Sequence, residues 1–150
     1  MFSRIVLVPV IAAALCAFVP QPLCAQSKEE GERLWREAYE LQKKAQSNED
    51  LTKAVEKYEE ALSIFRKVGD LKSEGSTLNN LGTVYWKWGN YDKAKECYEK
   101  DLAICREVKD RLGEGYTLNN LGLVYEGWGQ YDKAKEYFEQ SLATGCPDSG

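Results

Sequence analysis

The chain has 150 residues, of which 20 are basic and 24 acidic, and it contains no histidine. This mild negative charge, without a Lys/Arg stripe, gives no electrostatic support for a nucleic-acid or anionic-membrane partner. The missing histidine removes the usual general base, the usual activator of a cysteine nucleophile and the commonest zinc ligand. No glycine-rich phosphate-binding loop follows a strand, so we expect no catalytic residues, no metal site and no cofactor.

The first 25 residues are typical of a removable secretion signal. Arg4 supplies a positive start, residues 5–19 form an almost wholly apolar run, and the Pro20-Gln21-Pro22 segment is expected to break the helix before Ala25. We predict that residues 1–25 are removed, which leaves Gln26 as the new N-terminus of an exported chain, periplasmic or secreted.

A membrane anchor and a lipoprotein signal are the alternatives for this segment. The apolar run has 15 residues and includes Pro9, whereas a membrane-spanning helix needs roughly 20 residues. Cys16 and Cys24 each follow a leucine, where a lipoprotein signal needs a small residue. We therefore favour cleavage and expect no stable membrane insertion of the mature chain.

Self-similarity is the strongest pattern in the rest of the chain. Residues 70–104 align without a gap with residues 110–144, and 22 of the 35 positions are identical. The same shift of 40 residues applied backward finds a diverged third copy that keeps Ala54, Tyr58 and Leu62. We predict an array over residues 26–144, with units of about 28–69, 70–109 and 110–144, followed by a short tail over residues 145–150.

Each unit is predicted to form two helices. In the first helix, apolar residues recur at three- and four-residue spacing: Leu78, Leu81, Gly82 and Tyr85. Gly89 and Gly129 suit the left-handed position after a helix, and Asn90 suits the N-cap of the next one. The second helix is predicted to turn four residues inward: Tyr91, Ala94, Tyr98 and Leu102.

Glycines inside the first helices indicate close helix contact. Gly82 and Gly122 cost about 1 kcal/mol each relative to alanine in a helix, so they need a physical reason. Two helices approach most closely where one lacks a side chain, and Ala94 and Ala134 offer a small surface on the partner helix. A helix pair of this kind buries only part of its apolar face, so neighbouring pairs must stack to complete a core.

The order Leu81-Gly82, Tyr85, Gly89, Tyr91, Ala94, Tyr98 resembles the tetratricopeptide repeat. The period of 40 exceeds the usual 34 of that family and is similar to the longer-helix variety found in kinesin light chains, in spindle-orientation G-protein modulators and in large bacterial arrays. The resemblance implies an all-α solenoid of about three stacked antiparallel helix pairs. In the first unit Gln42 and Glu49 replace the helical and turn glycines, which puts its close packing in question and suggests a terminal cap.

The resemblance also implies a concave groove, lined by the first helix of each unit, that meets an extended peptide. A helical wheel centred on Leu78, Leu81 and Tyr85 shows which residues lie on the opposite side of the first helix. Ser76 and Gly127 lie on that side, as do the ten candidate partner-binding residues. These candidates are Asn79, Asn80, Thr83, Trp86, Lys87, Tyr116, Asn119, Asn120, Leu123 and Glu126.

Asparagine side chains suit peptide binding because each amide offers a donor and an acceptor to a peptide backbone. Asn80 and Asn120 match best the asparagine that some family members use in this way. The alternative is that these asparagines hydrogen-bond between adjacent helices or face water. Trp86, which Glu126 replaces in the third unit, is either an exposed contact residue or packs on a neighbouring helix.

Three cysteines remain after the predicted cleavage, and an odd number cannot all pair within one chain. Cys97 and Cys105 are eight residues apart, which separates them by roughly 12 Å along a helix and excludes a bond between them. Cys146 with either one stays possible. We interpret Cys97 and Cys105 as small packing residues, because they align with Tyr137 and Phe65.

The leading hypothesis is an exported scaffold that binds a peptide or protein partner in its groove. A second hypothesis follows from the C-terminus, where residues 144–150 are expected to stop the last helix early and no polar capping helix follows. The array is then a self-assembly module that forms homo-oligomers through this end. In a third hypothesis, the chain is the front end of a larger protein with a catalytic domain downstream.

Overall fold

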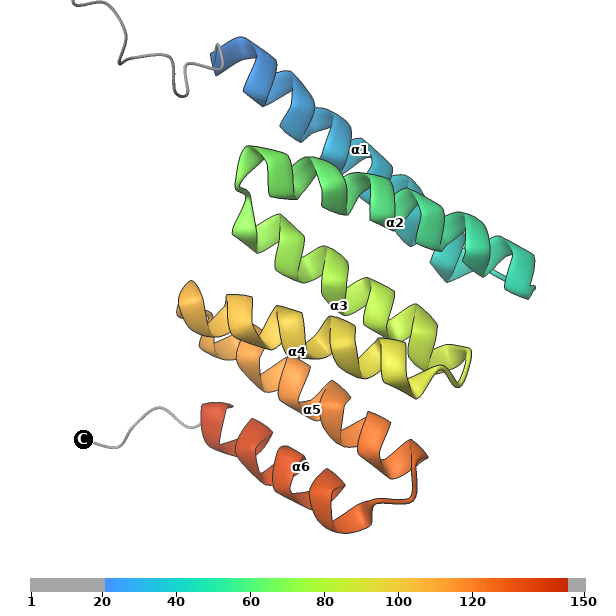
Figure 1. Cartoon of the computed structure of the whole chain (residues 1–150), viewed down its shortest axis with the longest axis vertical. Helices are drawn as coiled ribbons and strands as arrows, with labels where there is room; N and C mark the ends of the chain where they lie inside the picture. The colour runs from blue at the N-terminus through green and yellow to red at the C-terminus, as the bar shows by residue number, and fades with distance from the viewer. Residues whose placement is uncertain (1–20, 146–150) are drawn as a thin grey trace, which may run out of the picture.

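The computed structural model describes residues 21–145, so the predictions made on residues 1–20 and on Cys146 and the residues after it lie outside the described part. Six helices follow one another: α1 (Gln21–Lys44), α2 (Asn48–Val68), α3 (Leu71–Lys87), α4 (Tyr91–Glu107), α5 (Arg111–Gly127) and α6 (Tyr131–Gly145). Figure 1 shows them packed in sequential antiparallel pairs that stack along the longest axis. The predicted all-α solenoid of three helix pairs is confirmed.

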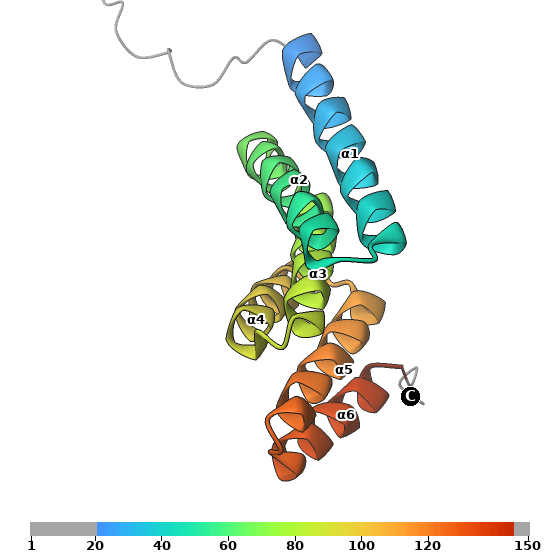
Figure 2. The same ribbon diagram turned by 90° about the vertical axis from the view of Figure 1, so that its right-hand side faces the viewer.

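The first helices of neighbouring units contact one another. Figure 2 shows α1 to the right of α2, and α5 to the right of α4, with α6 on the far side of α5. Direct contacts link α1 with α3 and α3 with α5, in addition to the contacts between consecutive helices. Within the described part of the chain, no helix has both the length and the apolar character needed to cross a membrane.

Glycines and short polar side chains set the helix ends. Gly89 and Gly129 adopt φ values of +71° and +72°, as predicted, because a residue without a Cβ enters the left-handed region without strain. The Asn90 side chain accepts a hydrogen bond from the backbone N–H of Lys93 (3.3 Å), which confirms the predicted N-cap of α4. Asp70 caps α3 in the same way.

The buried core lies between the two helices of each unit and between adjacent units. Leu78 and Leu81 of α3 are only 2% and 3% exposed, and Ala94 and Tyr98 of α4 are buried against them. The space left by Gly82 is filled by the ring of Tyr98, whose Cε1 atom would lie 2.6 Å from a Cβ at that position. Close approach at the glycine is therefore an aromatic contact, where the sequence predicted a contact between two small residues.

The first unit packs without the helical glycine. Gln42 stands in the place of Gly82, and its Oε1 accepts a hydrogen bond from the hydroxyl of fully buried Tyr58 (2.7 Å). Glu49 does not form the turn, because Ser47 caps α2 and Glu49 already lies in the first turn of that helix. Helix α2 consequently has 21 residues, whereas α4 has 17.

Helix α1 begins at Gln21, earlier than the proline segment suggested. Pro22 lies in its first turn, where a missing backbone N–H and a fixed φ are compatible with a helix. The expected helix break between Pro20 and Pro22 is therefore absent from residue 21 onward. A cleavage after Ala25 would remove the first turn of α1.

Replacing Gly82 with alanine tests the aromatic contact. The added methyl collides with the Tyr98 ring, which is 3% exposed and cannot withdraw, whereas alanine gains helix propensity. We expect a net loss of about 1 kcal/mol in the free energy of unfolding, measured by urea denaturation. Gly122→Ala should cost less, because the Phe138 ring that it meets is only half-buried. Exposed Ser63→Ala serves as the control, and equal stability of Gly82→Ala and Ser63→Ala would contradict the contact's importance.

Candidate functional site

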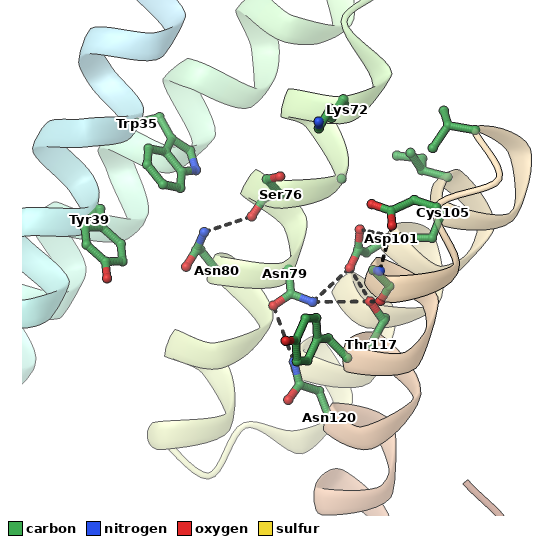
Figure 3. A pocket seen from close by; sticks show the side chains of 16 residues that line it. Trp35, Tyr39, Lys72, Ser76, Asn79, Asn80, Asp101, Cys105, Thr117 and Asn120 are labelled. Atoms are coloured by element: carbon green, nitrogen blue, oxygen red, sulfur yellow. Dashed lines mark hydrogen bonds between the residues drawn. The ribbon is translucent and has the colours of Figure 1, made fainter. Parts of the chain in front are cut away.

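A cavity of about 510 Å³ lies between the first helices of the three units. Its walls come from α1, α3 and α5, and the C-terminal end of α4 closes one side. Of the predicted residues, four line this cavity: Asn79, Asn80, Tyr116 and Asn120 (Figure 3). The structure therefore brings these residues of the second and third units together at one cavity.

One wall of the cavity is aromatic and belongs to α1. The rings of Trp35 and Tyr39 stack with their centroids 5.5 Å apart and nearly parallel planes. The Tyr39 side chain is 43% exposed, and Tyr116 on α5 is 64% exposed. Exposed aromatic side chains around a cavity offer a large contact area to a partner.

The two central asparagines are held by the protein itself. The Nδ2 of Asn79 donates to Oδ2 of Asp101 on α4 (2.8 Å), and the Oδ1 of Asn79 accepts from Nδ2 of Asn120 on α5 (3.3 Å). These two side chains thus hydrogen-bond between adjacent helices, which was the structural alternative for them. Figure 3 shows Asn79 turned toward Thr117 and Asp101.

Asn80 turns to the other side of α3, toward Trp35 and Tyr39 (Figure 3). Its Nδ2 donates to the backbone carbonyl of Ser76 in its own helix (2.9 Å). The amide donors of Asn80 and Asn120 are therefore directed to protein acceptors. Their Oδ1 atoms accept no hydrogen bond from the described residues, so the asparagines present acceptors to the cavity.

A buried carboxylate, that of Asp101, connects three helices at one side of the cavity. Asp101 on α4 is 4% exposed, and its Oδ2 accepts from Asn79 and from the hydroxyl of Thr117 on α5 (2.6 Å). Among the described residues, its Oδ1 accepts only from the thiol of Cys105, at 3.6 Å. Burial raises the pKa of Asp101 above its ordinary value, although the hydrogen bonds from Thr117 and Asn79 oppose the rise.

Sequence reasoning missed Asp101, but a signal was present. Residues 94, 98, 101 and 105 recur at four-, three- and four-residue spacing, which places residue 101 on the buried face of α4. The equivalent residues of the other units are Ala61 and Ser141, so an acid stands where the repeats otherwise use small side chains.

Trp35 and Tyr39 were also missed, because the wheel covered only the second and third units. Tyr39 aligns with Asn79, so the same wheel applied to the first unit would have found it, whereas Trp35 aligns with Gly75, which the wheel did not select. The indole Nε1 of Trp35 is buried and has no hydrogen-bond partner among the described residues.

Six predicted residues do not line the cavity: Thr83, Trp86, Lys87, Asn119, Leu123 and Glu126. The Thr83 hydroxyl is engaged within the protein, because it donates to the Asn79 carbonyl (3.0 Å) and lies 3.2 Å from the Tyr98 hydroxyl on α4. Trp86 is 36% exposed outside the cavity. The cavity follows the N-terminal parts of α3 and α5, whereas the prediction extended along the whole helix face.

A second cavity, of about 330 Å³, continues from the first between α1, α2 and α3. The two cavities share Trp35, Lys72 and Ser76. Glu32 and Arg36 add one charge of each sign to the second cavity. The indole of Trp35 therefore stands between the two spaces.

The described cysteines fit their interpretation as packing residues. Cys105 is buried beside Asp101, and desolvation raises the pKa of its thiol to about 12. Cys97 packs against the core, and burial raises its pKa to about 11. Thiols of such high pKa are poor nucleophiles at neutral pH. Over residues 21–145, no group of three or more acidic or cysteine side chains is placed to hold a metal ion.

Solved structures from three organisms share this arrangement of helices. The TPR domain of Arabidopsis FLU superposes with a TM-score of 0.70 at 20% identity over 78% of this chain and 95% of its own. BtubC (BKLC) from P. vanneervenii gives 0.70 at 22% identity, over 84% of this chain and 53% of its own. The N-terminal domain of stress-induced protein-1 from C. elegans gives 0.58 at 17% identity, over 85% and 87%. At these identities the likeness concerns the fold alone.

Among curated protein sequences, none matches this chain. The family model for the tetratricopeptide repeat matches residues 45–107 and 73–144, which together cover two thirds of the sequence. The matched region includes α2 to α6 and both copies of the strong repeat. With the three stacked helix pairs, this match shows that the chain belongs to the tetratricopeptide repeat family.

Proposed function

We propose that this protein binds an extended peptide segment of a partner protein in the cavity between α1, α3 and α5. Tetratricopeptide repeat domains generally serve as scaffolds for protein–protein interaction, which sets the class of function. The observation that carries the proposal is that the first helices of all three units line one 510 Å³ cavity with exposed aromatic and amide side chains. Pockets of this size bury a few residues of a ligand.

The asparagine oxygens define how a peptide is held. Asn80 Oδ1 and Asn120 Oδ1 are free to accept from backbone N–H groups of an extended chain, because their own amide groups donate within the protein. Contacts of this kind are independent of the peptide's side chains. The rings of Tyr39 and Tyr116 then supply apolar contact area on opposite helices.

Replacing Asn80 with alanine tests this mode of binding. Peptides are first selected on the immobilised chain from a random library, and their dissociation constants are then measured by calorimetry. We expect Asn80→Ala and Asn120→Ala each to weaken binding by about tenfold, because a buried peptide N–H loses its acceptor. Ser63→Ala on α2 is the control. Thermal unfolding of Asn80→Ala should match the unsubstituted protein, and unchanged affinity for every selected peptide would refute the role of the asparagines.

Self-association through α6 is a second candidate function, favoured by apolar exposure. Leu142 is 74% exposed, whereas the equivalent Leu62 and Leu102 are 7% and 8% exposed under the following unit. Tyr131 is 69% exposed, whereas its equivalent Tyr91 packs edge-on against Trp128 of the next unit. Within the described chain, α6 packs on α5 alone.

The opposite end of the array is charged, so the two ends are not complementary. Arg33 on α1 forms ion pairs with Glu30 and Glu37, and Lys44 pairs with Glu40. A head-to-tail contact would bury these charges against the apolar face of α6. Association should therefore join two α6 helices related by a twofold axis.

Light scattering over a wide concentration range measures this association. We expect the mass to rise toward that of a dimer, and Leu142→Lys to restore the monomer because it places a charge in the apolar contact. Glu40→Lys on α1 changes charge at the opposite end and should leave the mass unchanged. A strict monomer at every concentration would exclude this candidate.

We further propose that residues 1–25 direct export and are then removed. The charged start and apolar run of this segment support the proposal. Expression in a bacterial host, followed by mass determination of the protein in the periplasm or medium, should give a chain that begins at Gln26. Retention in the cytoplasm with residues 1–25 intact would contradict export.

A further inference from the structure

The carboxylate of Asp101 lacks a positive partner although it is almost completely buried. No basic nitrogen of the described residues lies within 4.0 Å of its oxygens, and its partners are the neutral groups of Asn79, Thr117 and Cys105. Buried charges in proteins are usually paired, because an isolated one is costly. The weakly satisfied atom is Oδ1, whose one hydrogen-bond donor in the described part of the chain is the Cys105 thiol at 3.6 Å.

Two glycines pack directly against the acidic groups that line the cavity. A Cβ on Gly75 would stand 2.8 Å from Oδ1 of Asp101, and a Cβ on Gly113 would stand 2.7 Å from Oδ2 of Asp110. Both glycines line the same cavity as the two carboxylates. A side chain at either glycine would collide with a carboxylate oxygen, so glycine at these two positions lets Asp101 and Asp110 take their places in the cavity lining.

The remaining lining of the cavity also favours a donor with positive charge. Its three charged side chains are Lys72, Asp101 and Asp110, so acidic groups outnumber basic ones. Asn80 and Asn120 present acceptor oxygens, and the side chains of Tyr39 and Tyr116 are partly exposed at the same cavity. Aromatic faces attract cations, and carboxylates form their strongest hydrogen bonds with them. Figure 3 shows Lys72 on the first turn of α3, separate from the group around Asp101.

From this geometry we infer that the groove selects a peptide carrying an arginine or lysine side chain, which enters the cavity and reaches the carboxylates of Asp101 and Asp110. This inference rests on the proposed function and specifies the partner's chemistry. The equivalents of Asp101 in the other units, Ala61 and Ser141, provide no charge, so the preference belongs to the side of the cavity where α3, α4 and α5 meet.

A pair of peptides that differ only in charge tests the inference. The probes are five-residue peptides with blocked ends and alanine at every position except the centre, which is arginine in one and its neutral isostere citrulline in the other. Binding to the full chain is followed by NMR, through the side-chain amides of Asn80 and Asn120 and the backbone amides of Gly75 and Gly113. We expect the arginine peptide to bind about tenfold more tightly than the citrulline peptide.

Asp101→Ser should remove this preference without unfolding the protein. The third unit already carries serine at this position, and Ser141 donates to the Gly115 carbonyl at 2.7 Å, so a serine at residue 101 has an equivalent partner in Gly75. Asp110→Asn keeps the capping oxygen of α5 and should reduce the preference in part. Ser63→Ala should leave the preference unchanged.

The outcomes separate this inference from the proposed function. Equal binding of both peptides in the groove would overturn the charge preference and leave peptide binding standing. A preference for arginine that survives in Asp101→Ser, or shifts confined to other surfaces, would show a general attraction to the acidic chain and would also overturn the inference. Absence of binding by either peptide at millimolar concentration would overturn it as well. The selection of peptides from a random library would then test separately whether the groove binds peptides at all.

Discussion

The contact between an aromatic ring of the second helix and a glycine of the first helix sets the spacing within the second and third units, and the rest of the array depends on it. Tyr98 fills the space above Gly82, and Phe138 fills the space above Gly122. In the first unit the two helices are joined at this position by a hydrogen bond, which Gln42 accepts from the Tyr58 hydroxyl. Because each pair is closely packed, its remaining apolar face can be covered only by the next pair.

The contact between units is where this array becomes specific. Between the second and third units, Asp101 joins α3, α4 and α5 through Asn79 and Thr117, and Asn79 in turn holds Asn120. The network positions the acceptor oxygen of Asn120 at the cavity. It also places a charge where a small side chain would pack at lower cost, so packing alone does not explain it.

The fold could be predicted from the sequence because its signals are local. The spacing of Leu78, Leu81 and Tyr85 depends on helix geometry alone, and the duplication repeats it. The site was predicted only in part, because its contacts depend on neighbouring units. Asn79 and Asn119 occupy equivalent positions in their units. Asn79 is covered by α5 and donates a hydrogen bond to Asp101, whereas Asn119 is exposed. Their different roles follow from position in the array.

The differences between the units therefore carry more functional information than their identities. Residues 77–82 and 117–122 are identical and mostly bury side chains in the core. Around the cavity the units diverge: Ser76 corresponds to Tyr116, and Asp101 to Ser141. Duplication supplies a stable scaffold, and substitutions that do not disturb the core can then adjust the groove. A cavity formed by unlike residues from three equivalent helices presents its acid on one side and its aromatic rings on others, so a bound chain can be held in one direction and one register.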